Sequence, residues 1–249
     1  MNRMNRLDDH IVEIEAFVQS TIDAGRQVRE WNLPERDTLV GDIGPSRNRM
    51  VFARDTAAEL GHPTADSCLG VLWTSDSDLV SDGRVRLIGP DLAEIVGQHS
   101  PLGQIVVLGS SGFGEDTEPF ALVSLRMVDG IPGVMSRISP DTAWYRMSRG
   151  AVDGGLDFRA LGREMMRNWK RNIPEVESIE ILFVTSDSAD LERLKAIARA
   201  AHEVTAAMRT ADWRRKGIDL SCAISHCGSC ADQSACTAIA RAGSLSHAG

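Results

Sequence analysis

Four of the five cysteines in this 249-residue sequence lie close together, between Cys222 and Cys236. Their spacing is C-x4-C-x2-C-x5-C, through Cys227 and Cys230, and small or polar residues separate them. Four thiolates at this spacing can surround one metal centre, either a [4Fe-4S] cluster or a tetrahedral zinc ion. A disulfide pair or unreactive thiols are the remaining interpretations. The spacing favours the iron-sulfur cluster, with zinc as the alternative.

Two further residues bear on this ligand set. His226 lies inside the cysteine run and could replace one thiolate, although a solvent-facing loop histidine is the simpler interpretation. The fifth cysteine, Cys68, begins an apolar stretch at 68–74 that is typical of a buried strand. We therefore predict that the metal ligands are Cys222, Cys227, Cys230 and Cys236, and that Cys68 is a core residue.

Charge and hydropathy exclude several classes of protein. A net charge of -8 argues against a nucleic-acid partner, because phosphate binding requires a concentrated excess of Lys and Arg. No apolar run approaches the roughly 18 residues of a membrane span, and the first residues lack the apolar segment of a signal peptide. We expect a cytoplasmic globular protein, where thiols stay reduced and a metal site is favoured over disulfides.

Segments with helical and strand periodicity alternate along the chain, which favours an α/β fold with a mixed sheet flanked by helices. The predicted helices are at 7–29, 51–60, 158–171 and 188–217, with one more from the glycine loop at 109–114 to about 128. The predicted strands are at 68–74, 84–88, 104–108 and 179–184, with one more between 135 and 147, and we expect 84–88 and 104–108 to be neighbours. We assign residues 1–217 to the α/β domain and 218–249 to a cysteine-cluster loop with a frayed tail.

One segment departs from the acidic balance of the chain. Residues 137–171 hold eight basic residues against four acidic ones. A solvated helix face explains this excess as well as an anion-binding site does.

Five short pieces, in the same order and at similar spacing, carry a resemblance to a known family. They are Ile88–Leu92, Pro101–Gly103, Glu115–Pro119, Gly133–Met135 and Ala143–Ser148. Together they resemble the middle region of the acetyl-CoA synthase β subunit. That subunit works with carbon monoxide dehydrogenase and assembles acetyl-CoA from CO, a methyl group and CoA. The similarity continues through the strand at 179–184 and the helix after it.

The resemblance implies a CoA-binding surface that includes Trp144, Arg146 and Arg149, an iron-sulfur cluster at the cysteine run, and a protein partner in a larger complex. The chemistry of the side chains agrees, because a guanidinium group binds phosphate bidentately and an indole face can stack on adenine. The alternative for Trp144 is a partly buried packing aromatic.

The sequence also departs from the family pattern. In the family a two-nickel site adjoins the cluster, and a later Cys-Gly-Cys holds the distal nickel; this sequence contains no Cys-Gly-Cys. Its cysteine run begins with x4 where the family has x2. We therefore expect an iron-sulfur protein that binds CoA or an acyl-CoA and acts as, or within, an acyl or one-carbon transferase, without the dinickel chemistry. The alternative is a non-catalytic, zinc-stapled interaction subunit of a larger complex. The sequence assigns no catalytic residue.

Overall fold

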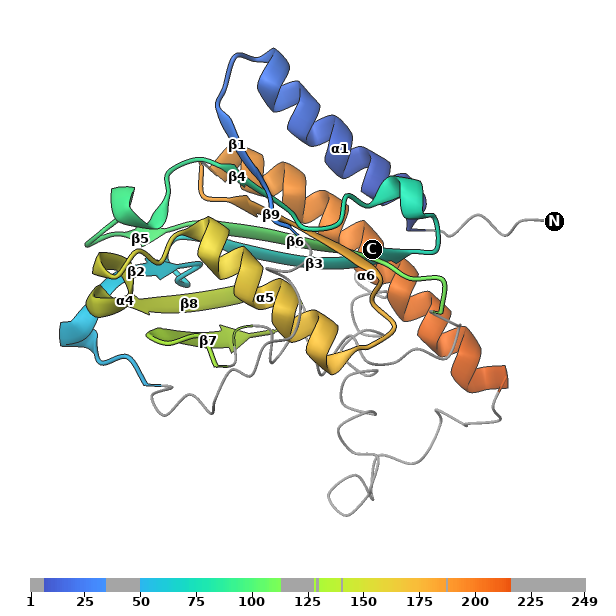
Figure 1. The fold of residues 1–249 in the computed structure, drawn as a ribbon. Coiled ribbons are helices and arrows are strands. Elements are labelled where there is room, and N and C mark those ends of the chain that lie inside the picture. Colours follow the sequence, from blue (N-terminus) through green and yellow to red (C-terminus); the bar gives the residue numbers. More distant parts are fainter. Residues whose placement is uncertain are drawn as a thin grey trace, which may run out of the picture. The chain divides into compact units, whose positions relative to one another are not determined.

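The computed structural model describes residues 7–34, 50–112, 128, 130–139, 141–186 and 188–215 (Figure 1). The cysteine run and the predicted helix that follows the glycine loop lie outside the described residues. The chain divides into two compact units, Met1–Ala201 and His202–Gly249. The sheets and the candidate site belong to the first unit.

A five-stranded mixed sheet forms the centre of the first unit. Its strands, in spatial order, are β1 (Val28–Asn32), β4 (Arg84–Ile88), β9 (Ser178–Val184), β6 (Leu102–Gly109) and β3 (Ser67–Thr74). The pairs β4–β9 and β3–β6 are parallel, whereas β1–β4 and β6–β9 are antiparallel. All residues of β6 are buried, so this strand is covered on both faces. The predicted α/β fold with a mixed sheet is confirmed.

A second sheet packs against the first. Its order is β5 (His99–Ser100), β2 (Thr56–Leu60), β8 (Ala143–Ser148) and β7 (Val134–Ile138). Burial alternates along β8, because successive side chains point to opposite faces of a sheet. Tyr145 faces the core, and its hydroxyl donates a hydrogen bond of 2.8 Å to the buried Gln104 side chain of β6. The two sheets therefore share one core, and the other face of the second sheet points outward.

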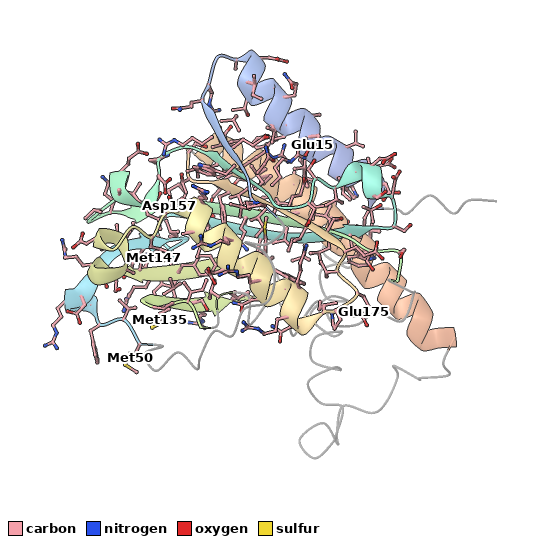
Figure 2. The ribbon with its side chains drawn as sticks, viewed as in Figure 1. Glu15, Met50, Met135, Met147, Asp157 and Glu175 are labelled. Atoms are coloured by element: carbon pink, nitrogen blue, oxygen red, sulfur yellow. The ribbon has the colours of Figure 1, made fainter. Side chains whose placement is uncertain are left out.

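Helices cover the rest of the five-stranded sheet (Figure 1). Helix α5 (Phe158–Asn172) begins at Asp157, labelled in Figure 2, whose carboxylate accepts a 2.7 Å bond from the Ala160 amide. The α5 residue Phe158 packs on Phe183 of β9, on the face shared with the second sheet. Helix α6 spans Ser188–Arg215, and its part in the first unit, up to Ala201, covers the opposite face, where Leu194 packs close to β6.

Helix α1 (Asp8–Asp23) is joined to the sheet by a charged network. Glu15, labelled in Figure 2, pairs with Arg84 at 3.0 Å and with Arg86 at 2.5 Å, both on β4. Arg84 also contacts Glu180 of β9 at 2.7 Å. Arg86 and Glu180 are only 3% and 2% exposed. Burial raises the pKa of Glu180, and the two arginines oppose that rise. Arg86 and Glu180, the buried part of this network, are therefore held away from water, whereas Glu15 is partly exposed.

Two predicted elements are corrected by the structure. The helix predicted at 51–60 is instead a 3-10 turn at Ala53–Asp55 followed by strand β2, because pairing with β8 and β5 outweighs the helical preference of its alanines. The helix predicted at 7–29 ends at Asp23, because the chain turns at Gly25, where φ is +74°. The residues after that turn form β1.

Two details of strand arrangement also differ from the prediction. The strands at 84–88 and 104–108 exist, but β9 lies between them and they are not neighbours. The region from 135 to 147 holds two strands, β7 and β8, which pair as an antiparallel hairpin. The predicted strands at 68–74 and 179–184 are confirmed as β3 and β9.

An ion pair connects the first turn of α6 to the segment after α1. Asp190 accepts hydrogen bonds from Arg26 through both carboxylate oxygens and one of 2.5 Å from Ser186. The Arg26 bonds are the main reason that the pKa of Asp190 lies below its usual range. Stability from this pair therefore exists above a pH of about 4 and is lost as the pH falls through the folded-state pKa.

We expect Asp190→Asn to lower the free energy of unfolding by about 1 kcal/mol at pH 7, a modest value because Arg26 is partly exposed. Urea unfolding of both proteins at pH 7 and at pH 3 measures this difference. The gap between wild type and variant should narrow at the lower pH. A gap that stays constant across this range would show that the charge of Asp190 is not the cause.

Candidate functional site

The outward face of the second sheet brings together residues from three strands, β8, β2 and β7. Trp144 and Arg146 are two positions apart on β8, so both point to this face. Glu59 of β2 is the register partner of Arg146 and shares the face. Arg137 of β7 is the register partner of Trp144 and is exposed. A tryptophan, two arginines and a glutamate are thus neighbours on one surface.

Glu59 links the two predicted CoA-binding residues of this face. Its carboxylate accepts a 2.9 Å hydrogen bond from Nε of Arg146 and a 3.2 Å bond from the indole Nε1 of Trp144. The guanidinium carbon of Arg146 lies 5.1 Å from the centre of the Trp144 ring, which is a cation-π arrangement. Because Glu59 is 7% exposed, it is a nearly buried anchor for both side chains.

The basic residues of the predicted surface differ in their surroundings. Arg146 is 23% exposed, and its Nη1 donates a 3.3 Å bond to the Val51 carbonyl. Arg149 begins the short helix α4 (Arg149–Asp153), directly after β8, and is exposed. The structure therefore brings Trp144 and Arg146 into contact, with Arg149 at the end of the same strand.

Several other basic residues of the segment at 137–171 lie on α5 and have acidic partners. Arg163 and Arg167 both bond to Glu164, at 3.2 and 2.8 Å, and Lys170 bonds to Asp82 at 3.0 Å. These pairs fit the interpretation as a solvated helix face. The part of the segment that fits an anion site is the sheet surface at Trp144.

Two histidines that the sequence analysis did not single out lie beside Glu59. His99 of β5 is the register partner of Glu59, and its ring stacks on His62 with centroids 4.2 Å apart. Nε2 of His62 lies 3.8 Å from Oε2 of Glu59. Between Glu59 and His62 the chain turns at Gly61, where φ is +63°. Only glycine fits there, because a Cβ would lie 2.1 Å from the Ala143 carbonyl oxygen.

The structure places one of the five cysteines. Cys68 is 1% exposed in β3, and burial raises the pKa of its thiol to about 12. This burial confirms the prediction that Cys68 is a core residue. The raised pKa disfavours the thiolate form, which makes Cys68 a poor metal ligand. Cys222, Cys227, Cys230, Cys236 and His226 lie outside the described residues, so their role stays a prediction.

Within the described part of the chain, no helix is long and apolar enough to cross a membrane.

These observations define an α/β domain of two packed sheets, with a tryptophan and arginines gathered on the outer sheet. The sequence profile of the CO dehydrogenase/acetyl-CoA synthase complex beta subunit matches residues 47–190. The chain belongs to this family, and the resemblance drawn from the sequence is confirmed. The matched residues include Glu59, Trp144 and Arg146, whereas the cysteine run lies beyond them.

Curated relatives of the chain include subunits of acetyl-CoA decarbonylase/synthase complexes. Subunit beta 2 of the acetyl-CoA decarbonylase/synthase complex of Methanosarcina acetivorans is 28% identical over 185 residues, which are 72% of this chain and 38% of the relative. The corresponding subunit beta of Archaeoglobus fulgidus is 29% identical over 170 residues, or 66% of this chain and 32% of the relative. The chain thus spans less than two-fifths of the length of these relatives, each of which is a subunit of a larger complex.

Proposed function

We propose that the outward face of the second sheet binds CoA or an acyl-CoA, and that the chain acts within an acyl or one-carbon transferase complex. The observation that carries this proposal is the contact of Trp144 with Arg146, flanked by the exposed Arg137. An indole face and several guanidinium groups on one surface suit the adenine and the phosphates of CoA. The names of the relatives support the class of reaction.

Each residue of this surface has a separate role in the proposal. Trp144 stacks on the adenine, while Arg146 and Arg149 bind phosphate oxygens. The bonds of Arg146 to described residues use Nε and Nη1, so we assign Nη2 to the phosphate. Glu59 does not contact the ligand; it fixes the Trp144 ring and the Arg146 guanidinium before CoA arrives. Such preorganisation lowers the entropic cost of binding.

We further propose that Cys222, Cys227, Cys230 and Cys236 bind a [4Fe-4S] cluster, with zinc as the alternative. The donor set fits, because four thiolates complete the coordination of either centre. A cluster with four cysteine ligands leaves no iron open, so its part is structural support or electron transfer. A non-catalytic interaction subunit stapled by zinc is the second candidate, favoured by the membership of the relatives in a complex.

Calorimetric titration of CoA into the full-length protein tests the CoA proposal. We expect binding that weakens with added salt, because exposed charges are screened over about 10 Å at 0.1 M ionic strength. Dephospho-CoA should bind more weakly than CoA. Trp144→Ala should reduce the affinity by about 10-fold or more, since aromatic stacking on a base contributes roughly 1–3 kcal/mol.

Arginine variants complete this experiment. Arg149→Ala should weaken CoA binding by about 5- to 10-fold through loss of a charge-assisted bond. Arg159→Ala is the matched control, because Arg159 is an exposed arginine on α5 and not on the second sheet. CoA that does not bind, or that binds Trp144→Ala and Arg149→Ala as it binds Arg159→Ala, would contradict the proposal and favour the interaction subunit.

A further inference from the structure

Glu59, which anchors Trp144 and Arg146 in the CoA proposal, also forms a cluster with two histidines that the proposal does not use, His62 and His99. One ligand atom from each residue lies within 4.8 Å of the other two. We propose that these three side chains bind a divalent transition-metal ion. Two imidazoles and one carboxylate suit zinc, iron(II), cobalt(II) and nickel(II) rather than magnesium or calcium, which prefer oxygen ligands alone. None of these three ligands is a thiolate.

The Glu59–His62 pair suits a metal ion after a small movement, whereas the His99 ring, which stacks on His62, must turn toward the ion. Bonds of about 2.0–2.1 Å place two ligand atoms of a tetrahedral ion roughly 3.4 Å apart. Nε2 of His62 and Oε2 of Glu59 are 3.8 Å apart, so they need to approach by only a few tenths of an ångström. His99 supplies the third ligand. Because its side chain is exposed, the ring can rotate without disturbing the core.

Neighbouring residues already orient two of the three ligands. Nδ1 of His62 is 2.7 Å from the Thr64 hydroxyl and 3.3 Å from the Thr64 amide nitrogen, and Nε2 is the ring nitrogen that faces Glu59. With a metal on Nε2, Nδ1 would carry the proton and donate it to the Thr64 hydroxyl, as the second nitrogen of metal-binding histidines commonly does. Arg146 bonds Oε1 of Glu59, whereas His62 faces Oε2. Oε2 also accepts the 3.2 Å bond from the Trp144 indole, and its second lone pair is the one that would bind the ion. An ion on Oε2 therefore leaves the Glu59–Arg146 pair in place, although the arginine charge reduces the affinity of the site.

The ligand count indicates the type of site. Three protein ligands fill three positions of a tetrahedral ion, and the fourth remains for water or another small ligand. A closed structural site would need a fourth side chain. The inference does not depend on CoA binding, even though Glu59 takes part in both surfaces, because its test uses the metal ion alone.

Cobalt(II) is the probe for this site, because its spectrum identifies its ligands. Bound to imidazole and carboxylate it shows weak visible bands, whereas thiolate ligands add strong charge-transfer absorption in the near ultraviolet. We expect the full-length protein to bind one cobalt ion without thiolate absorption, in addition to any metal at the cysteine run. That ion should be displaced by zinc, and it should quench the fluorescence of Trp144, whose indole bonds Glu59.

Variants of the cluster decide the outcome. His62→Asn and His99→Asn should each weaken this cobalt binding by about 10-fold or more, since even residues that only orient metal ligands contribute 10- to 100-fold. His10→Asn is the matched control, because His10 also pairs with a glutamate three residues away, Glu13, but on α1. Cobalt binding unchanged in His62→Asn, or cobalt with thiolate absorption alone, would overturn the proposal.

A milder variant tests the site even if the histidine variants do not fold. Thr64→Ala keeps all three ligands and removes only the hydroxyl that orients His62, so cobalt affinity should fall several-fold. An affinity equal to that of the wild type would contradict the proposed geometry. CoA titration of His62→Asn separates the two proposals: retained CoA binding with lost cobalt supports the metal site, and lost CoA binding with retained cobalt overturns it.

Discussion

Replacing Arg86 with methionine is expected to lower the free energy of unfolding by about 3–5 kcal/mol, because it leaves a buried carboxylate without one of its cations. Arg86 is 3% exposed and lies between Glu15 of α1 and Glu180 of β9. Methionine keeps much of the side-chain volume, so the loss reports on charge rather than on a cavity. Urea unfolding at pH 7, followed by circular dichroism, measures the change.

The matched control for this variant is Arg29→Met on β1. Arg29 pairs with Glu94 at 2.8 Å, but Glu94 is half exposed and water screens the pair. The cost of Arg29→Met should therefore stay below about 1 kcal/mol. If both variants cost the same, burial of the Arg86 network does not determine its contribution to stability.

The second large effect concerns metal content. Replacing Cys230 with serine should remove most of the iron and acid-labile sulfide from protein purified without oxygen, because a metal site is stable only with its full ligand set. Cys68→Ser should keep the metal, since the Cys68 thiol is buried in β3. Colorimetric iron and sulfide assays on both variants measure this difference.

The same assays separate the two kinds of centre. A brown protein with iron and sulfide supports the cluster, and a colourless protein with one zinc ion supports the alternative. Loss of metal in Cys68→Ser together with retention in Cys236→Ser would show that the ligand assignment is wrong.

Strands that are apolar runs in the sequence could be predicted from it. Strands that form only because a distant segment of the chain pairs with them could not. β9 is a nearly continuous apolar run, which local composition alone identifies. In β2 the residues Ala57, Ala58, Glu59 and Leu60 favour a helix locally. They form a strand because they pair with β8, which lies more than eighty residues later in the sequence. No local pattern in the sequence contains that information.

The candidate site shows the same limit. Trp144 and Arg146 could be named in advance because they lie in a recognisable stretch of sequence. Glu59 is 85 residues from Trp144 in the chain, and His99 reaches it only through the two-residue pairing of β5 with β2. The glutamate that positions both predicted residues, and the histidines beside it, become visible only once the order of the strands is known.

The position of β9 has a consequence for how the protein is made. Among the described residues, β9 is the last strand in the sequence, yet it lies between β4 and β6, which precede it by many residues. As the polypeptide leaves the ribosome, the edges of β4 and β6 that pair with β9 stay unpaired until residues 178–184 emerge. Open strand edges promote aggregation, and distant pairings form slowly. A nascent chain of this family member is therefore more prone to aggregate before its central strand is made than after.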